Sequence, residues 1–382
     1  MMIRASAALI GALLVGVVQA AQEPAAAPTI AAVRARVQAG ELDRAWALIQ
    51  KVPETGETLR EGITIALARQ DISGAVAWYE RLSRREPAGD ARLLGTIATV
   101  RARLLRTHED PAVRVQACAA LLPRTDEGCD KELRSWARDG ALDFTTRLAA
   151  AAALVRAGKE NSRPLLQDIV QSAPETSGAA VADALGGLPP GFATPVLIRL
   201  ASSGDRDARY LAGMALSRET GPEVLGTLRM LAADETAGAA RLAAYIGLAR
   251  AGDKEAMQIV DGALPLMGGR EALETARMLL ARRDPRGPKV VLSVLEGDDE
   301  LLRFDAAELL RATDRRRADA VILAGIASGN PWTRARALEA AANANLPANA
   351  TIRRELANDN PWVAVRAAQA VLSSRPVEAR AR

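Results

Sequence analysis

The chain has 382 residues, and its 50 Lys and Arg nearly balance its 46 Asp and Glu, for a net charge of +4 at pH 7. Aromatic residues make up only 3% and alanine is abundant, so the residues that fill β-sheets are scarce. The composition predicts an all-α protein, and the near balance of charge argues against a nucleic-acid partner.

Residues 1–20 have the composition of a secretion signal. Arg4 makes the amino end positive, residues 7–18 form an apolar run, and Ala20 ends a small-residue cleavage site. The run is short for a membrane span. We therefore expect an exported protein, periplasmic or secreted, cleaved near Ala20 and without a membrane span in the mature chain; an uncleaved anchor is the alternative. Residues 21–29, rich in Ala and Pro, are expected to form a linker.

Residues 30–105 are expected to form amino-terminal helical hairpins. Residues 37–45 and 68–75 each contain a polar turn followed by a helix start, and the second helix continues through Trp78 and Tyr79. This pattern resembles a tetratricopeptide-type (TPR-like) unit. A divergent form of the repeat that follows in the chain is the interpretation left open beside it.

Nine repeating units follow in residues 106–382. Six of them begin with an Asp or Asn that is suited to cap a helix, and three of these six have Pro at the next position. A central position lies four residues after the cap, recurs every 30 to 33 residues and is followed three residues later by a small side chain. These small residues are Ala117, Ala150, Val181, Ala212, Ala244, Ala276, Ala306, Ala337 and Ala367. The period predicts stacked helical pairs whose small-residue stripe lets a neighbouring helix approach closely.

The unit resembles the short HEAT-like repeat of about thirty residues. The residues that carry the resemblance are the cap and central pairs Asp110 and Arg114, Asp143 and Arg147, Asp205 and Arg209, and Asp299 and Arg303. The resemblance implies a right-handed α-solenoid of stacked helical hairpins, a HEAT-like or ARM-type superhelix, in which these pairs hold successive repeats in register. Because end units of solenoids need a polar outer face, the last helix is expected to cap the array.

The first unit carries both cysteines of the chain, Cys118 late in its first helix and Cys129 near the start of its second. Antiparallel helices would bring the two to a similar height, and export would place them in an oxidising environment. The sequence leaves open whether they form a disulfide that joins the hairpin.

We find no catalytic, cofactor-binding or metal-binding pattern in the sequence. The single histidine, His108, is expected to be a turn residue, because no second histidine accompanies it to form a zinc site with the separated cysteines. Residues 186–191 are rich in glycine but lack the lysine and the preceding strand of a phosphate-binding loop.

The expected function is that of a non-enzymatic scaffold of the bacterial cell envelope, with a protein partner in a concave groove lined by second helices. Trp332 and Trp362 occupy equal places in adjacent units, so we expect them about 10 Å apart, on a ridge that contacts the partner. Outward charges of the second helices are the other candidates: Arg199, Arg229, Arg353 and Arg354. The alternative is an enzyme or enzyme accessory of the HEAT-like lyase type that acts on a small ligand.

Overall fold

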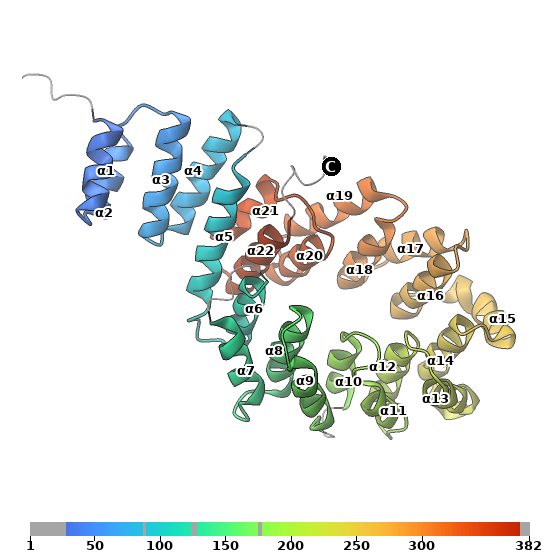
Figure 1. Cartoon of the computed structure of the whole chain (residues 1–382). Helices are drawn as coiled ribbons and strands as arrows, with labels where there is room; N and C mark the ends of the chain where they lie inside the picture. Colours follow the sequence, from blue (N-terminus) through green and yellow to red (C-terminus); the bar gives the residue numbers. More distant parts are fainter. Residues whose placement is uncertain (1–27, 87–88, 124–127, 175–177, 375–382) are drawn as a thin grey trace, which may run out of the picture.

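The structure is a computed structural model that describes residues 28–86, 89–123, 128–174 and 178–374. Its described residues form an all-α protein of 22 helices packed mostly as consecutive pairs (Figure 1). The expected secretion signal and nearly all of the linker lie outside the described residues. No helix in the described ranges is both long enough and apolar enough to span a membrane.

Five helices precede the repeats: α1 (Ile30–Gln38), α2 (Leu42–Ile49), α3 (Gly56–Ala68), α4 (Ile72–Arg85) and α5 (Ala91–Leu105). Both expected helix–turn–helix units are present as the pairs α1–α2 and α3–α4. The turn of the second pair forms because Asp71 accepts a hydrogen bond from the amide of Gly74 at 2.8 Å. Gly62 lets these two helices approach closely, since a Cβ at this position would overlap the ring of Trp78.

The structure contains a first helix in each of the nine units expected in residues 106–382. Each expected central residue lies in one of nine first helices: α6 (Pro111–Leu121), α8 (Phe144–Arg156), α10 (Gly178–Gly186), α12 (Arg206–Leu216), α14 (Ala239–Arg250), α16 (Gly269–Ala281), α18 (Glu300–Leu310), α20 (Pro331–Asn343) and α22 (Pro361–Ser373). The second helices are α7 (Cys129–Arg138), α9 (Ser162–Gln171), α11 (Thr194–Ala201), α13 (Pro222–Ala233), α15 (Lys254–Ala263), α17 (Gly287–Leu295), α19 (Arg315–Ile326) and α21 (Ala350–Arg354). Short 3-10 helices η3 (Leu264–Leu266) and η4 (Glu355–Ala357) directly extend α15 and α21. A third, η2 (Glu235–Ala237), follows α13 after the extended residue Asp234.

The caps and the small-residue stripe explain this regularity. All six expected cap side chains accept a hydrogen bond from an amide of the first helical turn; they are Asp110, Asp143, Asp205, Asp299, Asn330 and Asn360. All nine stripe residues are buried. Successive first helices therefore pack directly on one another, while the second helices lie on the outside of the array (Figure 1).

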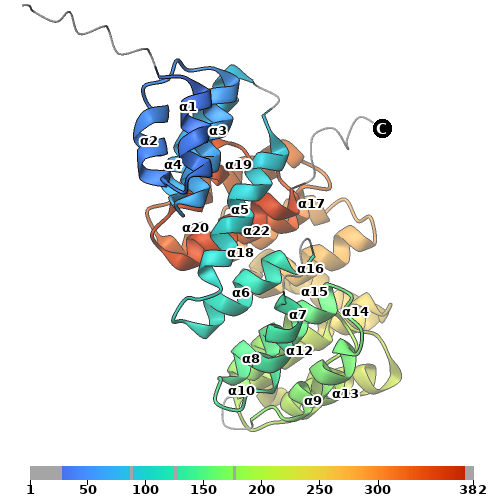
Figure 2. The ribbon, with the colours of Figure 1, turned by 60° about the vertical axis from the view of Figure 1, so that its left-hand side comes forward.

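The array closes on itself, so the expectation that the last helix caps an open end is wrong. Helix α22 packs against α20 on one side and against α5 and α6 on the other, and Figure 2 shows α5 lying across it. Val365 of α22 forms a separate apolar cluster with Leu105 and Val113. Helix α22, the last helix of the array, is thus packed on both sides and does not present a polar outer face. We call its packing against α5 and α6 the closure.

Polar contacts join the same two ends of the array. Arg353 binds both carboxylate oxygens of Glu80, at 2.6 and 3.1 Å. Nη2 of Arg101 donates to the carbonyl oxygen of Asn358 at 2.8 Å. These contacts extend the apolar closure to α4 and α5, so the amino-terminal hairpins also take part in it.

Candidate functional site

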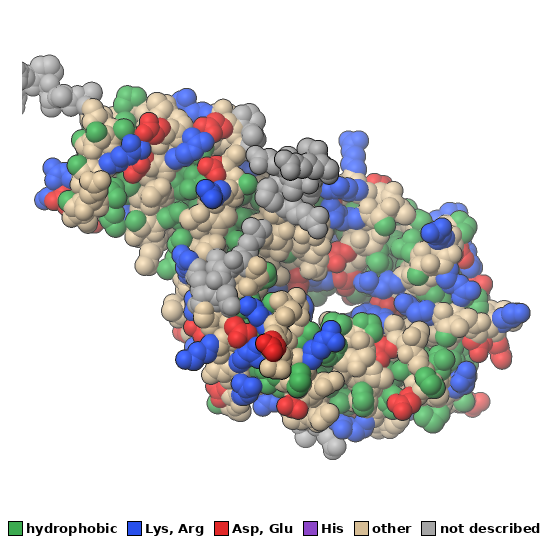
Figure 3. All heavy atoms as spheres, viewed as in Figure 1, with side chains coloured by type: hydrophobic (Ala, Val, Ile, Leu, Met, Phe, Trp, Pro, Cys, Tyr) green, Lys and Arg blue, Asp and Glu red, His purple; other side chains and the backbone are tan. Residues whose placement is uncertain are grey.

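The first helices surround an inner cavity of about 460 Å³. Residues of α10, α12, α16, α18 and α20 line it, and Figure 3 shows an opening bordered by acidic and basic side chains. The first helices therefore provide the inner surface, which corrects the expectation that the second helices line a groove.

Two ion pairs cross the inner cavity between helices that are not neighbours. Nη1 of Arg270, on α16, lies 2.6 Å from Oδ1 of Asp183, on α10. Arg218, just after α12, binds Oε1 of Glu274 on α16 at 2.6 Å. Because α10 and α16 are separated by two intervening first helices, these pairs tie opposite parts of the array together.

Glu274 is a buried carboxylate that faces three arginines. Its side chain is 1% exposed, and the nearest nitrogens of Arg218, Arg277 and Arg250 lie 2.6, 3.3 and 3.8 Å away. Burial lowers the pKa of Arg250. The cavity wall as a whole carries charges of both signs, because it is lined by Asp183, Glu274, Asp305 and Glu339 together with Arg218, Arg270 and Arg336.

A second set of polar contacts runs along the inner helices toward the closure. Arg336 on α20 binds Asp305 of α18 and, at 3.2 Å, Glu339. Arg366 on α22 continues the set by lying 3.4 Å from Glu339 and by donating to Gln116 of α6 at 3.1 Å. These side chains satisfy one another across four adjacent first helices, so we assign them to structure.

The two tryptophans expected on a ridge lie in contact. The ring centroids of Trp332 and Trp362 are 6.1 Å apart and the ring planes are tilted by 40°. The expectation that the two tryptophans lie about 10 Å apart is therefore wrong for the rings, because that spacing is one of packed helix axes and the side chains extend from the axes into aromatic contact. Trp362 is partly buried against the apolar cluster of the closure, whereas Trp332 is 66% exposed.

Leu301 extends this feature and was missed by the sequence analysis. It stands two residues before the central Arg303, as Trp332 does before Arg334 and Trp362 before Ala364. Leu301 is 51% exposed and also lines the inner cavity. The sequence signal that could have identified Leu301 is its position in the repeat, which is the same as that of the two tryptophans. Leu301, Trp332 and Trp362, which we call the apolar row, are the second residues of three consecutive first helices.

The four arginines expected on second helices have two kinds of environment. Arg199 on α11, Arg229 on α13 and Arg354 on α21 are exposed. Arg353 is mostly buried in its ion pair with Glu80 and belongs to the closure. The structure does not bring the four together at one surface.

The four central arginines of the cap and arginine pairs bind the ends of second helices. Arg209 lies 3.3 Å from Asp234 and Arg147 donates to Ser172 at 3.3 Å, in each case within one unit. The guanidinium of Arg114 lies over the ring of Trp136 on α7. Arg303 instead donates to the carbonyl of Gly297, which follows the second helix of the preceding unit. Three of these arginines therefore hold a hairpin together, and one reaches its neighbour.

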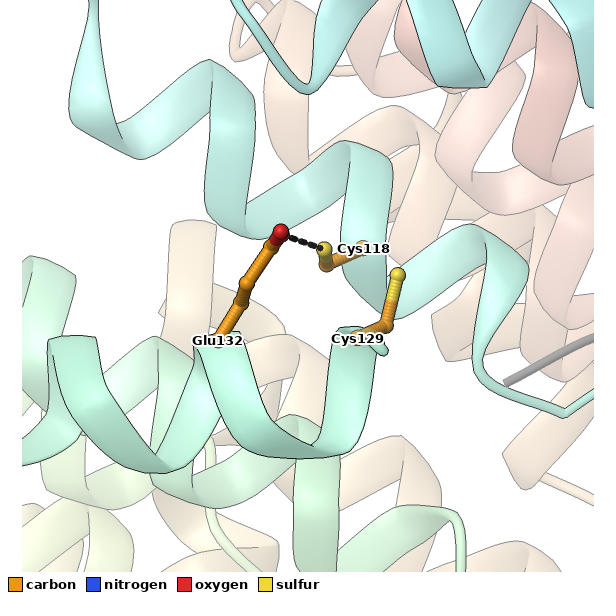
Figure 4. Close-up of side chains that lie close together, drawn as sticks. All are labelled: Cys118, Cys129 and Glu132. Carbon is orange, nitrogen blue, oxygen red and sulfur yellow. Dashed lines mark hydrogen bonds between the residues drawn. The ribbon is translucent and has the colours of Figure 1, made fainter. Parts of the chain in front are cut away.

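Cys118 and Cys129 lie together between α6 and α7, where Glu132 joins them (Figure 4). Both cysteines are fully buried, and one ligand atom of each of the three residues lies within 4.8 Å of the others. Cys118 Sγ donates to Oε2 of Glu132 at 3.2 Å. The hydrogen bond with Cys129 and then burial raise the pKa of the Cys118 thiol.

Arg106 holds the carboxylate of this cluster. It binds Oε1 of Glu132 at 2.6 Å and Oε2 at 3.3 Å. The sequence analysis missed Glu132, although it stands three residues after Cys129 and therefore on the same helix face. His108 is a turn residue, as expected, whose Nδ1 accepts a hydrogen bond from the amide of Asp110 at 3.0 Å.

Comparisons with protein-family models, with curated proteins and with solved structures gave no match to this chain.

Proposed function

We propose that the chain is a non-catalytic, HEAT-like protein-binding scaffold whose partner docks on the apolar row. The observation that carries the proposal is the row itself: Leu301, Trp332 and Trp362 are the second residues of three consecutive first helices, and two of them are more than half exposed. Exposed tryptophans that sit on a supported surface are typical anchors of protein interfaces.

The chemistry of the row favours a peptide segment with apolar side chains. Trp332 rests on Trp362, which is itself held by the closure, so the exposed indole has a fixed platform and loses little freedom on binding. Leu301 lies at the cavity, where Arg270 and Arg336 also contribute to the wall. A segment that crosses the row would therefore reach a wall of paired arginines and carboxylates with its next residues.

The first experiment places a photoreactive amino acid at position 332 or 230 in living cells. Met230 is the matched control, since it is an apolar side chain of similar exposure, 61%, on the outer helix α13. We expect one dominant protein adduct from position 332 and not from position 230. Equal adducts from both positions, or none from position 332, would refute docking on the row.

A second experiment measures affinity with the purified partner. The double variant Leu301→Ala and Trp332→Ala should bind at least tenfold more weakly than the wild type, because truncation of interface anchors typically costs about 2 kcal/mol. Met230→Ala should bind as the wild type does. An unchanged affinity of the double variant, with helicity retained, rules out the row as the docking surface.

The inner cavity favours a second candidate function, an accessory protein that binds a small polar ligand. Its volume lies within the usual range for ligand sites, and both arginines and carboxylates line its wall, where Arg218 pairs with Glu274. Native mass spectrometry of the purified protein tests it. A bound metabolite that is lost in Arg218→Ala and kept in Arg199→Ala supports this function, and a ligand-free wild type opposes it.

We also propose that the chain acts outside the cytoplasm, as residues 1–20 indicate. Sequencing of the amino terminus of the protein purified from cell-envelope and cytoplasmic fractions tests this location. A form that begins just after Ala20 and is found in the envelope or medium supports it, whereas an uncut cytoplasmic form opposes it.

A further inference from the structure

The residues around the two cysteines can host covalent chemistry that the scaffold function does not use. Cys118 and Cys129 are hydrogen-bonded thiols of two adjacent helices, held apart from solvent and next to a carboxylate. Two chemistries suit such a cluster, a bound thiophilic metal ion or a disulfide.

The surroundings of Glu132 favour the disulfide. A structural zinc site has four ligands, and the described residues supply three here. Arg106 already binds both carboxylate oxygens of Glu132, and one of them also accepts the hydrogen bond from Cys118. A metal ion bound to this carboxylate would therefore compete with Arg106 for the same oxygens. Disulfide formation leaves the ion pair between Arg106 and Glu132 intact, so no buried charge loses its partner.

We propose that Cys118 and Cys129 form a reversible disulfide. The oxidant is an external disulfide, either a small molecule or a thiol–disulfide oxidoreductase, and because both thiols are buried it reaches them when the hairpin of α6 and α7 opens locally. The Cys118 thiolate attacks one sulfur of this oxidant and releases the first thiol. Cys129, as the thiolate, then attacks the sulfur of Cys118 in this mixed disulfide. The bond between Cys118 and Cys129 forms and the second thiol is released. Two electrons and two protons pass from the protein thiols to the two released thiols.

The bond would act on the unit that receives the end of the array. Cys118 follows Ala117, which belongs with Val113 to the apolar cluster that α22 completes. A covalent link from α6 to α7 restricts this unit in the unfolded chain and so stabilises the surface on which α22 packs. The oxidised protein is therefore the more stable form.

The test counts thiols in the full-length protein before and after treatment with oxidised glutathione, by alkylation in denaturant and intact mass. We expect an intramolecular disulfide, a mass lower by two hydrogens, a higher Tm and full reversal by dithiothreitol. Cys129→Ala should show no oxidant-dependent rise in Tm. Two alkylated thiols after oxidation, an intermolecular disulfide, or a stoichiometric metal ion that blocks oxidation would each overturn the proposal.

Discussion

Arg353 and Glu80 are 273 residues apart in the sequence, yet the guanidinium of one binds both carboxylate oxygens of the other at 2.6 and 3.1 Å. Both side chains are mostly buried. This pair joins α4 to the last units of the array and makes the closure a specific contact.

Arg353→Ala should destabilise the protein by about 2 kcal/mol, because it leaves the mostly buried Glu80 without its partner. Arg354→Ala is the matched control, since this neighbouring arginine is exposed, and it should change stability by less than about 0.5 kcal/mol. Denaturant unfolding monitored by circular dichroism measures both. Equal effects of the two variants would show that the pair contributes nothing to the closure.

Gly325→Ala should destabilise by about 1 to 3 kcal/mol through overpacking. A Cβ at Gly325 would overlap the ring of Phe304 and lie 2.9 Å from Cβ of Ala337. Gly226→Ala, in helix α13, is the control because nothing lies within 4 Å of the new atom. The control should be neutral or stabilising by up to about 1 kcal/mol, since alanine favours a helix. Thermal unfolding compares the two, and a stable Gly325→Ala protein would contradict the close packing of α18, α19 and α20.

Asp299→Ala should cost about 1 kcal/mol, because this side chain accepts hydrogen bonds from the amides of Leu301 and Leu302 at 3.0 Å each. Asp298→Ala removes another exposed carboxylate, which stands one residue before the cap. It should have an effect within about 0.5 kcal/mol. Urea unfolding of the two variants separates the effect of capping from that of surface charge. If Asp299 acts as a cap, Asp299→Ala must lower the free energy of unfolding more than Asp298→Ala does.

Asp284 should make stability depend on pH in a narrow acidic window. Hydrogen bonds from Arg286 lower the pKa of this carboxyl from its ordinary 3.8 to about 2. The ionised form is therefore favoured in the folded state, and its contribution is present above about pH 4 and lost as the pH falls through about 2. Because Arg286 is partly exposed, screening reduces this contribution to about 1 kcal/mol.

The variant Asp284→Asn provides the comparison for this pH dependence. It should be less stable than the wild type at pH 5 and should approach the wild type near pH 2. Unfolding free energies between these values measure the difference. If the difference in unfolding free energy between the two proteins were the same from pH 5 to pH 2, the ion pair of Asp284 with Arg286 would not be the cause of that difference.

The helices and their stripe were predictable because they depend on local pattern. A cap at Asp205 and small residues such as Ala212 act within one helix and its immediate neighbour, so a period of about thirty residues is visible in the chain. The position of Leu301 in the repeat was visible in the same way. Its exposure was not, because it depends on which surfaces the neighbouring units cover.

The cluster of Cys118, Cys129 and Glu132 was predictable in part. Adjacent antiparallel helices brought the cysteines together as the sequence indicated, whereas the place of Arg106 comes from how α5 packs beside α6.

By itself the sequence determined an all-α chain of paired helices, with their starts and the face on which they stack, because caps and periodic small residues act over a few turns. Only the tertiary structure decided that the array closes, that first helices enclose the cavity, and that Arg353 meets Glu80. Closure depends on contacts between helices that are far apart in the chain, such as α22 with α5 and α6, and no single unit specifies these contacts.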